Sequence, residues 1–115
     1  MSVTIYHNPR CSKSRQTLQL LRDNGVEPTI IEYLKMPPDV ATLEQLLNML
    51  GLEPRELMRK KESAYKEAGL DATSLSRAAL LQGMVDHPQL IERPIVVCGG
   101  KAAIGRPPEQ VLSIL

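Results

Sequence analysis

One of the two cysteines stands in a setting suited to chemistry. Cys11 follows a short strand-like segment and precedes a helix-like one, and the basic residues Arg10, Lys13 and Arg15 surround it. Unpaired backbone N–H groups and the positive end of the helix dipole meet at such a turn, where they lower the pKa of a thiol and bind anions. We therefore predict that Cys11 is a thiolate nucleophile for a tetrahedral oxyanion.

Two further residues near Cys11 could support this chemistry. Ser14 carries a hydroxyl that can donate a hydrogen bond to a thiolate. His7 lies four residues before Cys11, at the end of the preceding strand-like segment. From the residues alone, His7 either takes part in the chemistry or holds the turn.

The residues that follow Cys11 do not match two other known thiol motifs. A Cys-x5-Arg phosphatase loop would need arginine at position 17, where Thr17 stands, and a Cys-x-x-Cys dithiol would need cysteine at position 14. If Cys11 turns over in a redox reaction, an external thiol must complete the cycle. Cys98 ends an apolar segment and is expected to be a packing residue.

Segments rich in β-forming apolar residues, apolar residues at helical spacing, and turn residues predict the elements that must position Cys11. Strands are expected at 3–6, 29–34, 94–98 and 101–104, and helices at 13–24 with Ser12 as the N-cap, from Thr42 to 50, at 74–85 and from 106 onward. The order is β-α-β, then helices, then β-β-α. It predicts a single α/β domain over 1–115 that resembles the thioredoxin-like fold, with a mixed sheet and a helical insertion, about 40–87, between its two halves.

Composition narrows the classes of partner. The 115 residues carry a net charge of +1 and only 3% aromatic residues, which argues against nucleic acid as a partner. No apolar run approaches membrane-spanning length, and no signal peptide is apparent. The histidines and cysteines match no metal-binding spacing. We expect a cytoplasmic monomer with no membrane partner, no metal and two reduced thiols.

Five segments, in order along nearly the whole chain, resemble the glutaredoxin-coupled arsenate reductase family. They are His7-Asn8-Pro9-Arg10-Cys11-Ser12-Lys13-Ser14-Arg15, Glu32-Tyr33-Leu34 with Pro37-Pro38, Leu57-Met58-Arg59-Lys60, Arg93-Pro94-Ile95-Val96-Val97, and Gly105-Arg106-Pro107. The resemblance implies a thioredoxin-like fold with a helical insertion, in agreement with the element order.

The resemblance also implies a role for particular residues. The catalytic cysteine is Cys11, and the histidine and serine that hold it as a thiolate are His7 and Ser14. The three oxyanion-binding arginines are Arg59, Arg93 and Arg106; Arg15 matches a further family position, and Pro94 matches the cis-proline of thioredoxin-like folds. These assignments are expectations from the family pattern.

The implied reaction is the reduction of arsenate to arsenite, with a role in arsenic detoxification. Cys11 would form an adduct with arsenate, glutathione would serve as the reducing co-substrate, glutaredoxin would restore the thiol, and no cofactor would be bound. Two alternatives are a glutathione-dependent thiol oxidoreductase with another substrate and a non-catalytic regulator that binds RNA polymerase. Ser14, in place of a second cysteine, argues against a redox-switched regulator.

Overall fold

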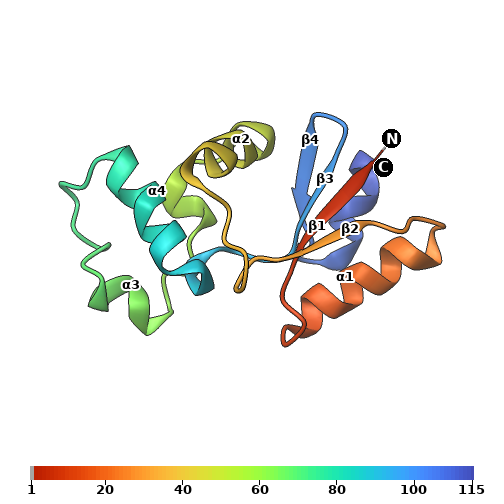
Figure 1. The fold of residues 1–115 in the computed structure, drawn as a ribbon, viewed down its shortest axis with the longest axis horizontal. Helices are drawn as coiled ribbons and strands as arrows, with labels where there is room; N and C mark the ends of the chain where they lie inside the picture. Colours follow the sequence, from red (N-terminus) through yellow and green to blue (C-terminus); the bar gives the residue numbers. More distant parts are fainter. Residues whose placement is uncertain (1) are drawn as a thin grey trace. The chain divides into compact units, whose positions relative to one another are not determined.

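The computed structural model describes residues 2–115, which pack into two compact units (Figure 1). The first unit joins the N-terminal segment up to Met36 with Arg93–Leu115, and the second is Pro37–Glu92. The helical insertion expected at about 40–87 falls within the second unit. No helix among residues 2–115 is long and apolar enough to cross a membrane.

The first unit is built on a four-stranded mixed sheet in the order β2-β1-β3-β4. Its elements are β1 (Val3–His7), α1 (Ser12–Asp23), β2 (Thr29–Glu32), β3 (Ile95–Cys98), β4 (Lys101–Ile104) and the 3₁₀ helix η3 (Pro108–Ile114). The strands β1 and β2 are parallel and are joined through α1, whereas β3 is antiparallel to both β1 and β4. This arrangement confirms the predicted mixed α/β sheet.

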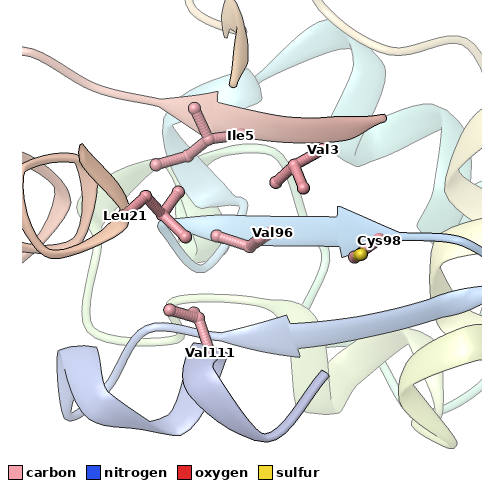
Figure 2. Packing of buried hydrophobic residues seen from close by; sticks show 6 residues of the cluster. All are labelled: Val3, Ile5, Leu21, Val96, Cys98 and Val111. Atoms are coloured by element: carbon pink, nitrogen blue, oxygen red, sulfur yellow. The ribbon is translucent and has the colours of Figure 1, made fainter. Parts of the chain in front are cut away.

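Aliphatic side chains fill the space between the sheet and the helices α1 and η3. Figure 2 shows Leu21 of α1 and Val111 of η3 directed toward the strand residues Ile5 and Val96. All four side chains are fully buried. Cys98 joins the same cluster, which agrees with its expected packing role. Burial of this kind is the main favourable contribution to folding of a small domain.

Two local predictions in the first unit are wrong. Cys11, and not Ser12, is the N-cap of α1, because Cys11 keeps an extended backbone (φ −93°, ψ 123°) while Ser12 already belongs to the helix. The helix expected from 106 onward is instead the seven-residue 3₁₀ helix η3, which starts at Pro108. A segment of seven residues closes only a few α-helical hydrogen bonds, so the tighter 3₁₀ pattern costs little free energy here.

The second unit is helical throughout. It contains α2 (Val40–Leu50), η1 (Pro54–Leu57), α3 (Ser63–Glu67), α4 (Arg77–Asp86) and η2 (Pro88–Leu90). The helix α2 begins before the predicted Thr42, because the Asp39 side chain accepts a hydrogen bond from the Thr42 N–H and caps the helix. In the same way, Ser76 caps α4, so this helix starts later than predicted. The short helix α3 was not predicted.

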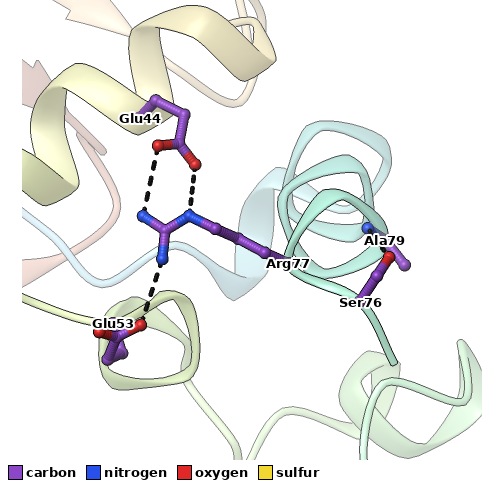
Figure 3. Close-up of polar contacts among 5 residues, drawn as sticks. All are labelled: Glu44, Glu53, Ser76, Arg77 and Ala79. Atoms are coloured by element: carbon purple, nitrogen blue, oxygen red, sulfur yellow. Dashed lines mark hydrogen bonds and ion pairs between the residues drawn. The ribbon is translucent and has the colours of Figure 1, made fainter. Parts of the chain in front are cut away.

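A charged cluster ties three elements of the second unit together (Figure 3). The Arg77 guanidinium donates to both carboxylate oxygens of Glu44, at 2.7 and 3.3 Å, and to Glu53 at 3.2 Å. These side chains are largely solvent-exposed, so the cluster contributes little to the free energy of unfolding. It orients α4 against α2 and η1.

Gly105 occupies a contact point between α1 and the start of β3, next to Arg106. A methyl group here would lie 2.8 Å from Pro94 Cγ and 3.0 Å from Thr17 Cγ2, and both neighbours are buried. Gly105→Ala is therefore expected to lower the free energy of unfolding by about 1–3 kcal/mol.

Urea denaturation measures this change, and Gly100→Ala is the matched control, because nothing lies within 4 Å of the added methyl group. Equal denaturation midpoints for the two variants would contradict the tight packing at Gly105.

Candidate functional site

Cys11 lies at the N-terminus of α1, after a three-residue connection, Asn8 to Arg10, from the end of β1. The Cys11 N–H donates to the Asn8 carbonyl at 3.0 Å, and the Arg10 N–H donates to Asn8 Oδ1, also at 3.0 Å. Asn8 thus shapes the loop through its own main chain and side chain. The loop holds Cys11 where the first free N–H groups of α1 converge.

Two arginines and two main-chain N–H groups surround the thiol. Arg106 Nη2 lies 3.5 Å from Cys11 Sγ. Burial acts to raise the pKa of the Cys11 thiol, but the Ser14 N–H, the Arg93 side chain and the Lys13 N–H outweigh it, and the net pKa is lowered. A thiol with a lowered pKa exists as the nucleophilic thiolate at lower pH than an ordinary cysteine.

The hairpin of β3 and β4 brings Arg93 and Arg106 together. Because Ile95 pairs with Ile104 in this antiparallel hairpin, positions 93 and 106 lie at the same end, each two residues beyond the pair. Arg106 Nε donates to the Arg93 carbonyl at 2.7 Å, which links the two residues directly. The peptide bonds that follow both arginines, to Pro94 and Pro107, are cis; the resemblance implied the first and not the second.

His7 and Ser14 form a buried pair behind the loop. His7 Nδ1 and Ser14 Oγ lie 2.6 Å apart, and Ser14 Oγ also accepts the Asn8 N–H at 3.0 Å. Burial and the positive charges of Arg15 and Arg22 lower the pKa of His7, although Glu32 acts in the opposite direction. The side chain of Ser14 therefore contacts His7 and Asn8, and it is the main-chain N–H of Ser14 that reaches the thiol.

Arg15 and Arg59 lie in different settings. Arg15 donates from Nη1 to the Pro9 carbonyl at 2.9 Å and so braces the Cys11 loop. Arg59 belongs to the second unit, where its guanidinium faces Glu62 at 3.5 Å and Glu92 at 3.9 Å. Binding of an oxyanion by either arginine stays a prediction.

A cleft of about 320 Å³ lies beside the Cys11 loop. It is lined by His7, Asn8, Pro9, Arg10, Glu32, Leu34 and Lys35. Lys35 and Glu32 form an exposed ion pair at 3.7 Å. The cleft therefore offers cationic, anionic and apolar groups to a small ligand. No cluster of three or more metal-ligating side chains occurs within residues 2–115.

Sequence reasoning assigned no role to Tyr33 or Asn8, although both belong to the segments that resemble the family. Tyr33 is only 1% exposed and follows β2 directly. Asn8 is 7% exposed in the loop. Asn8 could have been found from its place in the turn before Cys11, whereas Tyr33 falls inside the strand predicted at 29–34 and gave no such signal.

The fold and the site define a class of protein: a thioredoxin-like domain with an activated thiol at a helix N-terminus and two arginines beside it. Comparison with known proteins agrees with this class. The model of the ArsC family matches residues 6–114. The chain belongs to the ArsC family.

Individual relatives match over nearly their whole length. The protein YfgD of Escherichia coli is 64% identical over 98% of this chain and 96% of its own. The arsenate reductase of Haemophilus influenzae is 51% identical, with complete coverage of both chains. The solved structure of the arsenate reductase from Vibrio cholerae is 58% identical, covers 100% of this chain and 98% of its own, and superposes with a TM-score of 0.97.

Proposed function

We propose that this protein is an arsenate reductase that uses glutathione and glutaredoxin. The observation that carries the proposal is the Cys11 thiol, with Arg106 Nη2 at 3.5 Å and the Arg93 side chain beside it. Paired guanidinium groups bind the oxygens of a tetrahedral oxyanion with charge-assisted hydrogen bonds. The names of the relatives that match this chain along its whole length add support.

In the first step, the Cys11 thiolate attacks the arsenic atom of arsenate. A sulfur–arsenic bond forms, and a hydroxyl group of arsenate takes up a proton from solvent, breaks its bond to arsenic and leaves as water. Arg93 and Arg106 neutralise the charge of the remaining oxygens and orient them. The main-chain N–H groups of Lys13 and Ser14 hold the thiolate before the attack. The oxidation state of arsenic does not change in this step.

Reduction follows when glutathione attacks the adduct. The glutathione sulfur bonds to the sulfur of Cys11, the sulfur–arsenic bond breaks, and its electron pair stays on arsenic, which leaves as arsenite. The two thiols together supply the two electrons that convert As(V) to As(III). The thiol of glutaredoxin then attacks the mixed disulfide, takes up the glutathione and releases Cys11 as a thiol.

We place glutathione in the cleft next to the Cys11 loop. Arg10 and Lys35 offer cations for its two carboxylates, and Glu32 offers an anion for its ammonium group. Leu34 adds an apolar contact. The cleft volume of about 320 Å³ is of the size that small-molecule sites use. Arg93 and Arg106 are not among the residues that line this cleft, so both stay available to bind arsenate.

We also propose that the protein acts in arsenic detoxification as a cytoplasmic monomer, with neither metal nor prosthetic group. A reducing compartment suits the chemistry, because Cys11 must return to the thiol after each cycle. Both cysteines are free thiols in the structure.

A coupled assay tests the reaction. With glutathione, glutaredoxin and glutathione reductase present, the protein is expected to make NADPH oxidation depend on arsenate. Omission of either glutathione or glutaredoxin should stop the signal. Turnover of a glutathionylated peptide without any arsenate-dependent signal would instead favour a thiol oxidoreductase. Absence of both signals, together with retention of RNA polymerase on the immobilised protein, would favour a regulator.

A further inference from the structure

Tyr33, Asn8 and Arg93 form a row across one end of the sheet. The parallel pairing of β1 with β2 ends at His7 and Glu32, so Asn8 and Tyr33 are the next positions on the two chains. On the other side, Tyr6 pairs with Ile95 in the antiparallel register of β1 and β3, which sets Asn8 opposite Arg93. The row lies at the end of β1 from which the Cys11 loop departs.

The Tyr33 hydroxyl is buried without a well-formed hydrogen bond to any described residue. Burial of an unsatisfied hydroxyl costs free energy, so a phenylalanine would suit packing alone at least as well. The hydroxyl is nonetheless close enough to Asn8 and Arg93 for both side chains to lower its pKa, whereas burial, the larger effect, raises the pKa of Tyr33 to about 12. Tyr33 is therefore a neutral phenol beside a guanidinium.

We propose that Tyr33 is a positioning residue, whose buried hydroxyl holds the Arg93 guanidinium against the Cys11 thiol. Arg93 is the cation of the row that hydrogen-bonds the thiol. A neutral oxygen beside the guanidinium restricts its orientations and leaves its charge in place, whereas a carboxylate would neutralise that charge. The Tyr33 hydroxyl can also accept a hydrogen bond from an N–H of Arg93 when an anion binds at Cys11.

This inference rests on the proposed role of Cys11 as the nucleophile, and it does not depend on arsenate as the substrate. The reactivity of the Cys11 thiol toward iodoacetamide therefore tests the role of Tyr33 separately from the proposed arsenate reduction, because alkylation needs no oxyanion. Mass spectrometry of the Cys11 peptide distinguishes this thiol from that of Cys98. In the wild type, Cys11 alkylation is expected to reach its half-maximal rate at a lower pH than alkylation of an ordinary thiol does, because the pKa of Cys11 is lowered.

Tyr33→Phe removes only the hydroxyl. At a pH below the thiol pKa, we expect Cys11 alkylation to slow by about threefold or more, because a less restrained Arg93 stabilises the thiolate less. The free energy of unfolding is expected to stay the same or rise, because the hydroxyl that is lost is buried and makes no well-formed hydrogen bond. In an Arg93→Ala background, Tyr33→Phe should have no further effect on the alkylation rate.

Tyr65→Phe is the matched control. The Tyr65 hydroxyl is also buried beside an arginine, but it accepts a hydrogen bond from Arg55 Nη1 at 2.6 Å in the second unit. This variant is expected to lose stability and to keep the wild-type alkylation profile. The proposal is overturned if Tyr33→Phe keeps the wild-type profile, or if it slows alkylation further in the Arg93→Ala background. A lack of arsenate turnover would overturn only the proposed function.

Discussion

In the coupled assay, Cys11→Ser is expected to abolish arsenate-dependent oxidation of NADPH. A serine hydroxyl is not ionised at neutral pH and cannot form the disulfide by which electrons reach arsenic. The rate should fall on the order of 10³-fold or more, to the level of the assay without protein. Initial rates at saturating arsenate measure the effect.

Cys98→Ala is the matched control for this loss. Cys98 is 5% exposed and packs in the core of the first unit. Its replacement should lower the free energy of unfolding slightly and leave turnover in place. If Cys98→Ala were inactive while folded, or if Cys11→Ser kept turnover, Cys11 would not be the sole nucleophile.

Arg93→Ala is expected to lower kcat/KM for arsenate by about ten- to a hundredfold. A hydrogen bond to a charged group contributes about 1.5–3 kcal/mol, and Arg93 has two such partners in the proposed reaction, the thiolate and the oxyanion. The loss should appear both as a higher KM and as a higher pH for half-maximal activity. The second effect arises because Arg93 helps to lower the pKa of Cys11.

Lys101→Ala removes the same charge from an exposed side chain of β4, at the opposite end of the β3–β4 hairpin from Arg93. It is expected to leave kcat/KM within about twofold of the wild type, because solvent and salt screen an exposed charge that lies away from Cys11. Equal losses in the two variants would assign the effect to net charge. An unchanged kcat/KM in Arg93→Ala would remove Arg93 from the site.

Different observations support the family membership of this protein and the roles of its residues. The ArsC family model covers nearly the whole chain, and relatives named arsenate reductase match it from end to end. The geometry adds a physical basis for the thiol chemistry, since Cys11 lies between a helix start and two linked arginines. The proposed assays test which oxyanion and which reducing thiol the protein uses.

The sequence by itself determined the sheet-forming segments and the setting of Cys11. Short-range patterns sufficed for these: a continuous run of apolar residues predicts β3, and the Gly99-Gly100 pair is a signal for the hairpin that follows. Helix starts were less accurate, because an Asp39 or Ser76 cap is decided by one side-chain hydrogen bond. The formation of a 3₁₀ helix in place of an α-helix at η3 depends on a similarly small difference in free energy between the two kinds of helix.

The tertiary structure decided which groups meet at the thiol. Arg93 and Arg106 are far from Cys11 in the chain, and only the register of β3 and β4 brings them to one end of the sheet and to Cys11. The same holds for Tyr33, a residue that sequence patterns treat as part of a strand but that pairing places in line with Asn8 and Arg93. Register is a long-range property, fixed by packing and hydrogen bonding between segments distant in sequence, so no local pattern could have supplied it.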